Sequence, residues 1–189
     1  MKPILFNTEM VRAILDGRKT QTRRVVSGEN NQILLKNLFN NYDDYSYDSF
    51  MESEVKYKIG DILYVRETWA YVCCCCQTPW CCDNKIYYKA DGEEQEFERC
   101  TTSWKPSIHM PKQYARIFLK IKNVRVERLQ DITRLDVWNE GIRIPCVGAS
   151  LPMELYDKWK ELWNSTSKDG YKWEDNPYVF VYEFERVEK

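Results

Sequence analysis

The hydrophobic positions of the chain repeat most regularly with a period of two, which is typical of a β-strand that buries one face. Residues 178–187 alternate in this way, and so does the segment after Tyr114, where apolar residues occupy every second position. Residues 62–69 carry apolar side chains on both faces, which predicts a buried strand. Shorter strands are expected at residues 2–6 and 86–88, and after the basic segment that starts at Arg18.

Signals for helices are fewer and lie in the connections between these strands. Thr8 is a predicted N-cap, and Gly17 suits the left-handed position at which that helix would end. The segment Thr133–Asp136 resembles a capping box, and Gly141 would stop the helix that it starts. A further helix is expected at about 151–163. Because regular strand–helix–strand alternation is absent, the pattern favours an α+β fold, a small and mostly antiparallel β-barrel with short peripheral helices.

Two segments interrupt this pattern, and we interpret them as insertions in a single domain that spans residues 1–189. Residues 27–56 are rich in Asn, Asp, Ser and Tyr, which predicts a long and poorly ordered surface excursion. Residues 73–100, in approximate bounds, contain most of the cysteines and an acidic stretch. Both insertions would be attached to the barrel as loops.

The composition excludes several classes of protein. Lys and Arg total 28 while Asp and Glu total 29, so the chain is neither a uniformly basic nucleic-acid coat nor an acidic tail protein. Hydrophobic residues make up 43%, which is enough to bury a core and argues against global disorder. No apolar run approaches the roughly 18 residues of a membrane span, and the N-terminus lacks the apolar stretch of a signal peptide. We therefore expect a cytoplasmic protein without membrane contact.

The charges are unevenly distributed despite this balance. Basic residues outnumber acidic ones in residues 1–26 and in residues 104–128, where Glu127 is the one acidic residue. If these stretches are neighbours in the fold, they form a positive surface that favours phosphates, and nearby Tyr and Trp side chains could stack on bases. The alternative is that the charges of the strands simply face water.

Eight cysteines are present, and six of them fall between Cys73 and Cys82. In a reducing cytoplasm such residues are thiols or metal ligands rather than a disulfide framework. Cys73 and Cys76 form a C-x-x-C pair that Cys81, Cys82 or Cys100 could complete to a structural zinc site. A second C-x-x-C pair with regular spacing is missing, so a loop of free thiols without any cofactor is favoured over zinc.

The segment that starts at Gly17 has the form G-x-K-x-x-T-x-R, in which Lys19 and Thr22 are the central fixed positions. This signature resembles that of the ASCH domain family, relatives of the PUA RNA-binding barrels. An ordered series of further segments looks like the larger ASCH proteins of phages and prophages, namely residues 2–6, 60–69, 104–111, 124–133, 139–141 and 176–179. The two insertions fall outside the resemblance.

The resemblance implies a PUA-like barrel with a cleft beside the signature, and a role in RNA binding. One bacterial branch of the family removes the acetyl group of N(4)-acetylcytidine, and its catalytic residues match Lys19, Thr22 and Glu140 here. In that chemistry Lys19 is the base that takes the proton of the Thr22 nucleophile, and Glu140 protonates the departing ring amine. Burial and neighbouring arginines would lower the pKa of Lys19 and suit it to that role.

The spacing raises one geometric objection to this triad. Residues 19 and 22 are an odd number apart, so in a regular strand their side chains point to opposite faces. The pair can meet only if residues 18–21 form a turn, which Gly17 makes reasonable. The alternative is that Lys19 is a solvated cation and Thr22 an ordinary strand residue.

Other candidates for ligand contact each have a structural alternative. Arg18, Arg23 and Arg24 could grip phosphate or a base edge, or could simply be exposed. The remaining candidates are Arg66, Glu67, Trp69 and His109. For these four the alternatives are a charge pair between the first two, core packing of the tryptophan, and a packed histidine in a rigid connection.

Three functional hypotheses follow from these patterns. The leading one is a binding module that receives RNA or a nucleoside-type ligand in a basic cleft at the signature. The second is an amidohydrolase acting on acylated pyrimidine nucleosides. The third is a phage accessory protein that binds a host protein through its two insertions.

Overall fold

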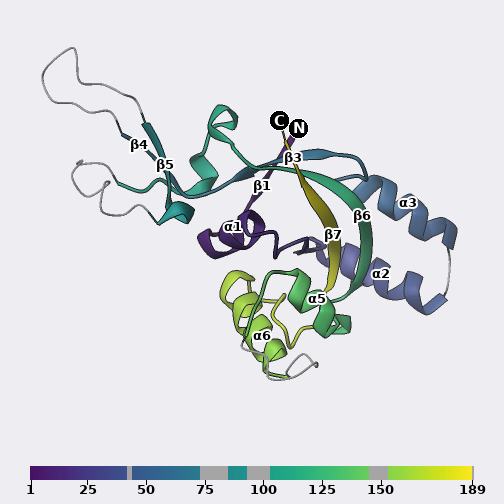
Figure 1. Ribbon diagram of the computed structural model, residues 1–189. Helices are drawn as coiled ribbons and strands as arrows, with labels where there is room; N and C mark the ends of the chain where they lie inside the picture. The colour runs from purple at the N-terminus through teal and green to yellow at the C-terminus, as the bar shows by residue number, and fades with distance from the viewer. Residues whose placement is uncertain (42–43, 73–84, 93–102, 145–152, 189) are drawn as a thin grey trace, which may run out of the picture. The chain divides into compact units, whose positions relative to one another are not determined.

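The computed structural model describes residues 1–41, 44–72, 85–92, 103–144 and 153–188 (Figure 1). The chain forms two compact units. The first comprises Met1–Gly17, Ile62–Lys120 and Arg186–Lys189, and the second comprises Arg18–Asp61 and Ile121–Glu185. Each unit joins segments that are distant in the sequence, and the assignment of residues 1–189 to a single domain stays a prediction.

Five strands are hydrogen-bonded in the order β1-β3-β6-β7-β2. Their bounds are β1 Lys2–Leu5, β2 Gln21–Val25, β3 Ile62–Arg66, β6 Phe118–Arg128 and β7 Tyr178–Val187. Together with the helices below, they confirm the predicted α+β class. In the described part of the chain β1 and β2 have one hydrogen-bonded neighbour each, so the sheet is open and the predicted barrel is not closed. Strand patterns reveal which faces are buried, but not whether the end strands pair.

The long strand β6 belongs to both units. Its first residues pair with β3 in antiparallel register, with Leu119 opposite Leu63, and its remainder lies in the second unit. Leu119 and Ile121 are buried while Lys120 and Lys122 are exposed, as the alternation predicted. The strand begins at Phe118, later than the sequence pattern suggested, because Lys112–Tyr114 form a short 3-10 helix, η3.

In the first unit, β1 pairs in parallel with β3, and helix α1 (Thr8–Leu15) follows β1. Asn7 rather than Thr8 is the N-cap, since its side chain accepts a hydrogen bond from the backbone of Met10 at 2.8 Å. The strand expected at 62–69 divides into β3 and β4 (Trp69–Val72), and β4 pairs with β5 (Lys85–Tyr88). The 3-10 helices η1 (Lys89–Asp91) and η2 (Ser107–His109) complete the described part of this unit.

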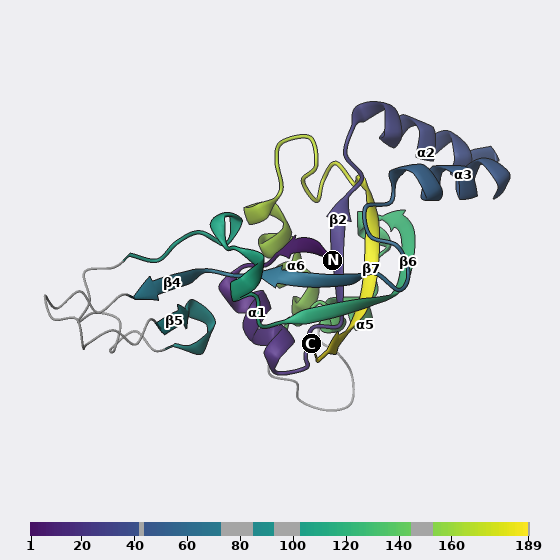
Figure 2. The same cartoon turned by 90° about the horizontal axis from the view of Figure 1, so that it is seen from above.

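In the second unit, residues 27–56 contain two helices, α2 (Glu29–Asn41) and α3 (Asp44–Glu54), which run side by side (Figure 2). The predicted poorly ordered excursion is therefore wrong. Leu35 and Leu38 of α2 are buried, and Phe50 of α3 stacks on Phe180 of β7 at a centroid distance of 6.2 Å. A helical apolar spacing is present in this segment, but the many polar residues around it conceal it.

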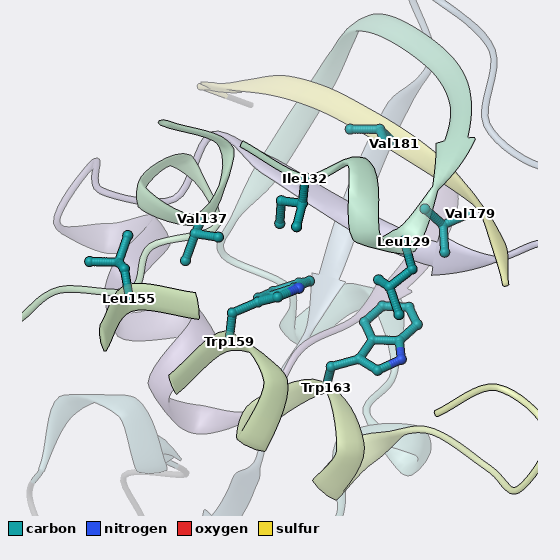
Figure 3. Packing of buried hydrophobic residues seen from close by; sticks show 8 residues of the cluster. All are labelled: Leu129, Ile132, Val137, Leu155, Trp159, Trp163, Val179 and Val181. Atoms are coloured by element: carbon teal, nitrogen blue, oxygen red, sulfur yellow. The ribbon is translucent and has the colours of Figure 1, made fainter. Parts of the chain in front are cut away.

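The core of the second unit lies between β7 and two further helices, α5 (Arg134–Asn139) and α6 (Glu154–Thr166). Thr133 and Asp136 form the predicted capping box at the start of α5, which follows the 3-10 helix η4 (Leu129–Asp131). Figure 3 shows the eight buried residues of this core: Leu129, Ile132, Val137, Leu155, Trp159, Trp163, Val179 and Val181. Among the described residues, none of the helices has the length and apolar character needed to cross a bilayer.

Candidate functional site

The signature, residues 17–24, begins where α1 ends. Gly17 has a φ of 69°, a left-handed conformation that disfavours any side chain, and its N–H donates to the carbonyl of Ile14 at 3.0 Å. Its predicted role as the stop of this helix is confirmed. Arg18 follows, and its guanidinium donates to the carbonyl of Gly141 at 2.9 Å. The chain then enters β2.

Lys19 and Glu140 meet although they lie 121 positions apart in the sequence. Nζ of Lys19 is 2.6 Å from Oε2 of Glu140 and 3.0 Å from the Glu140 carbonyl oxygen. Their backbones form an isolated antiparallel bridge, and their side chains are 0% and 1% exposed. The structure thus brings together two of the three residues that the resemblance implied as catalytic, and Lys19 is not a solvated cation.

Arg23 is buried beside this pair. It donates to Oε1 of Glu140 at 3.1 Å and through Nε to Glu127 at 3.0 Å. Arg125 also donates to Glu127 at 3.1 Å, to Asp136 at 3.2 Å, and to Glu183. Three of these residues, Lys19, Arg23 and Glu140, have side chains that are excluded from solvent, and we call them the buried ion network. Charges inside a protein need such partners, because unpaired they would lose their hydration without compensation.

Burial lowers the pKa of Lys19 below its usual value, although the contact with Glu140 opposes this shift and Arg24 and Arg23 add to it. Both causes of lowering, desolvation and like charge, are those expected from the sequence. Burial also lowers the pKa of Arg24, which is half-buried. The site therefore disfavours further positive charge.

Thr22, the third residue of the implied triad, takes a different position on β2. Gln21 donates to the carbonyl and side chain of Asp136 at 3.0 and 3.1 Å, and Arg23 reaches the same side. Because side chains alternate along a strand, Thr22 lies on the other face, opposite Tyr182 of β7. Lys19 forms a bridge instead of part of a turn, so the geometric objection to a Lys19–Thr22 pair applies in this structure.

A cavity of about 370 Å³ borders the signature within the second unit. Thr20 and Gln21 line it from the signature, and Asn139 lines it from the end of α5. The Thr20 hydroxyl and the Asn139 amide make no side-chain hydrogen bond within the described part of the chain, although their backbones are joined by a 2.8 Å bond from Thr20 N to Asn139 O. Leu135, Asp136, Glu183, Phe184 and Lys122 complete the lining.

The contacts of Gln21, Arg125 and Asp136 were not identified from the sequence. The acceptors of Gln21 lie 115 positions away from it, and a strand glutamine shows no pattern that marks such a contact. Glu127 was recognised only as an acidic residue in a basic stretch. The charge pattern of β6 was a usable signal only in part: a carboxylate between Arg125 and Arg128 predicts a cationic partner, but that partner, Arg23, lies on β2, two strands away.

Four other candidates lie in the first unit and make contacts there. Glu67 is buried and accepts two hydrogen bonds from Arg116, at 3.0 and 3.1 Å, so its partner is not Arg66. Arg66 instead donates to the carbonyl of Met110 at 2.7 Å. Trp69 packs in an aromatic core cluster, as its structural alternative predicted. His109 is exposed at the end of η2, so the packed position is not found.

The zinc candidates Cys73, Cys76, Cys81 and Cys100 lie outside the described residues. Within the residues that are described, no group of three or more His, Cys, Asp and Glu side chains is arranged to hold a metal ion. The zinc hypothesis and the free-thiol alternative both stay predictions.

Comparisons with known proteins reveal similarity of arrangement only. No family model and no curated protein matches the chain. Protein EF3133 from Enterococcus faecalis V583, described under family-model DUF984, is similar at 10% identity with a TM-score of 0.43. The ASCH domain from Lactobacillus crispatus JV V101 is similar at 13% identity with a TM-score of 0.37. The matches cover 94% and 95% of this chain, which spans 66% of the first protein and 72% of the second. Similarity of this degree leaves the function to be inferred from the site itself.

Proposed function

We propose that the second unit binds a nucleoside-type ligand, either a free nucleoside or an exposed base of RNA, in the cavity beside the signature. One observation carries this proposal. The cavity offers neutral polar groups that have no side-chain partner, whereas the buried cations of the signature are already paired with carboxylates. The resemblance of the signature to that of the ASCH domain family, for which RNA binding is the proposed role, supports the same ligand class.

The ion pairs argue for recognition of a base rather than of phosphates. Lys19 and Arg23 have side chains that are 0% exposed, and each contacts the carboxylate of Glu140. To bind a phosphate, either cation would have to leave a buried partner, and breaking such a pair typically costs about 3–5 kcal/mol. The positive surface expected from the sequence is thus largely neutralised at the signature.

The chemistry of the cavity suits a nucleobase. The Asn139 side chain presents both donor and acceptor groups, and the Thr20 hydroxyl can do either, which matches the polar edge of a base. Leu135 and Phe184 supply apolar surface against which a flat ring can lie. RNA recognition commonly uses unstacked bases read in this manner.

The proposal is tested by calorimetric titration with the four nucleosides and with short single-stranded RNAs at low and moderate salt. We expect Asn139→Ala to weaken binding about tenfold, the value of one hydrogen bond in a partly buried site. Asn37→Ala is the matched control, because Asn37 is an exposed residue of α2. A loss of affinity of about 10³ or more between roughly 50 and 200 mM salt would instead indicate binding through many phosphates and would overturn the proposal.

Hydrolysis of an acylated pyrimidine nucleoside is a second candidate, favoured by the 2.6 Å contact between Lys19 and Glu140. The lowered pKa of Lys19 increases its neutral fraction, the form that could accept a proton from the Thr22 hydroxyl. With the shared proton of the Lys19–Glu140 pair on Glu140, Thr22 would add to the amide carbonyl as its proton passes to Lys19, and Glu140 would protonate the departing amine. Water would then hydrolyse the acyl ester on Thr22 and release the acid. This reaction requires Thr22 and Lys19 to approach across β2, whereas binding requires no rearrangement, so we place binding first.

The assay for hydrolysis is release of cytidine from N(4)-acetylcytidine, followed by absorbance. Thr22→Val preserves the shape of the side chain and should abolish turnover while binding persists. Thr20→Ser is the matched control, since it retains the hydroxyl at the cavity. Wild-type protein that binds the nucleoside without cleaving it would eliminate the catalytic hypothesis and leave the binding proposal intact.

The third hypothesis concerns a host protein bound through the two insertions. Most of residues 73–100 lies outside the described residues, and 27–56 forms the α2–α3 pair. Binding to a host partner therefore stays a prediction, to be tested by capture from host lysate with and without nuclease treatment.

A further inference from the structure

A second cavity, of about 450 Å³, lies in the second unit and shares no lining residue with the cavity beside the signature. It is formed by α2, by the end of β6, and by the segment that precedes β7. Two cations, Lys36 and Arg128, and two carboxylates, Asp169 and Asp175, contribute to its lining. The volume falls within the range of about 300–1,000 Å³ that is typical of small-molecule sites.

Arg128 is held in a fixed orientation at this cavity. Its guanidinium carbon lies 3.9 Å from the centroid of the Tyr178 ring, and Nη1 donates to the carbonyl of Asn176 at 3.0 Å. This contact is the one hydrogen bond of the Arg128 side chain within the described residues. An arginine has five N–H donors, so most of them remain available to a ligand.

The backbone at Asn176 supports this arrangement. Asn176 has a φ of 45°, and among the described residues it is the one non-glycine with a positive φ. Its side-chain oxygen accepts a hydrogen bond from Gln130 N at 2.9 Å, while its carbonyl receives Arg128. Such a conformation persists where the surroundings determine it, and it commonly occurs where a group must be positioned. We therefore regard the Arg128 guanidinium as preorganised.

The charged groups around the cavity are not paired with each other. The side chains of Lys36 and Asp169 are exposed and make no hydrogen bond or ion pair within the described part of the chain. Asp175 accepts a hydrogen bond from the backbone N of Lys172 at 2.8 Å and makes no ion pair there either. A ligand that carries both an anionic group and hydroxyl donors would satisfy cations and carboxylates at once.

We propose that this cavity binds a nucleotide through its phosphate, independently of the nucleoside site proposed above. Arg128 and Lys36 bind the phosphate oxygens, because a guanidinium recognises phosphate through two parallel hydrogen bonds and an ammonium adds a point charge. Asp169 and Asp175 accept hydrogen bonds from the ribose hydroxyls, a recognised role of carboxylates in nucleotide sites. Tyr171, which also lines the cavity, provides an aromatic side chain for contact with the base.

The test is calorimetric titration of the full chain with each of the four nucleoside 5′-monophosphates and with the corresponding nucleosides, in buffer without phosphate. We expect Arg128→Lys to weaken monophosphate binding about tenfold and Lys36→Ala to weaken it severalfold. Neither change should alter nucleoside binding at the other cavity. Asn139→Ala should weaken nucleoside binding there and leave the contribution of Arg128 and Lys36 to monophosphate binding unchanged. Lys158→Ala, at an exposed lysine of α6, is the matched control.

Lys36→Ala is the second variant in case Arg128→Lys disturbs folding, because the Lys36 side chain is exposed and makes no hydrogen bond or ion pair within the described residues. Monophosphate affinity that is unchanged in both variants, or reduced equally by Lys158→Ala, would overturn the nucleotide site while leaving the nucleoside proposal standing. A 5′-phosphorylated RNA compared with its 5′-hydroxyl form distinguishes the source. If Lys36→Ala weakens binding of the 5′-phosphorylated RNA but not of the 5′-hydroxyl RNA, the terminal phosphate of an RNA strand binds at the same site.

Discussion

Arg23 and Glu140 lie 117 positions apart in the sequence, yet Nη1 of the arginine is 3.1 Å from Oε1 of the glutamate, with both side chains excluded from solvent. The other oxygen of the same carboxylate accepts the hydrogen bond from Lys19. One buried carboxylate thus joins two buried cations of the signature. The residue that the resemblance implied as a catalytic acid is therefore also a structural centre of the second unit.

Removing the charge of Glu140 should strongly destabilise the protein. Glu140→Gln leaves Lys19 and Arg23 with less negative charge inside the protein, and we expect a loss of about 3–5 kcal/mol in the free energy of unfolding. Urea denaturation provides the measurement. The control is Glu185→Gln, which removes an exposed partner of Lys122 at 3.4 Å and should change stability by no more than about 0.5 kcal/mol. Equal effects of the two substitutions would show that the buried ion network does not stabilise the fold.

Tyr182 should make the protein less stable as the solution becomes strongly alkaline. Burial raises the pKa of this phenol to about 12, whereas the unfolded chain ionises near its ordinary value of about 10. Between these values the unfolded state binds fewer protons than the folded state, so the free energy of unfolding falls as pH rises. Tyr182→Phe should reduce this slope in urea denaturation at a series of alkaline pH values. Identical slopes in both proteins would contradict the assignment.

The capping box of α5 should contribute to stability because this helix leads into Glu140. Asp136 N donates to the Thr133 hydroxyl at 3.1 Å, and Thr133 N donates back to Asp136 at 3.0 Å. Thr133→Ala should lower the free energy of unfolding by about 1 kcal/mol, while Thr133→Ser should retain most of it. Thermal denaturation distinguishes the two variants. A serine variant as unstable as the alanine variant would exclude the cap as the cause.

In the first unit, Arg116 links two carboxylates, and a double substitution tests this role. Arg116 donates hydrogen bonds to both carboxylate oxygens of buried Glu67. It also donates to both carboxylate oxygens of Asp91, at 2.7 and 2.8 Å. Arg116→Met should destabilise the protein by several kcal/mol, because Glu67 loses its partner inside the protein. Adding Glu67→Gln should recover part of that loss, since burial already raises the pKa of Glu67 and the neutral amide removes the charge. No recovery in the double variant would mean that packing of Arg116, rather than charge, is responsible.

Local features of the fold were accessible from the sequence where a few neighbouring residues determine the structure. The capping residues Thr133 and Asp136, the left-handed Gly17, and the alternation around Leu119 are examples. Each depends on backbone chemistry within one or two turns, so the sequence pattern contains the whole cause. The meeting of Lys19 and Glu140 was expected only through a resemblance, because no local rule joins residues so far apart.

Features that depend on distant partners were missed or misassigned. Arg23 was read as a residue for phosphate or solvent, yet its partners come from β6 and from the end of α5. The sequence pattern predicts an irregular loop where α2 lies, because Leu35 and Leu38 are buried only through contacts that the tertiary fold supplies. Whether an arginine faces water or a carboxylate is decided by sheet register, which a single sequence does not reveal.

The pairing of β2 with β7 also has a consequence for how the protein is made. Gln21 of β2 lies opposite Glu183 of β7, so the ribosome must add about 160 residues before the pair can form. At about 5–20 residues per second this takes roughly 10–30 s, during which β2 lacks the strand with which it pairs. Pairing of β2 can therefore occur only after nearly all of these residues have been synthesised, and a chain on a ribosome stalled before residue 178 would carry the signature without its partner strand.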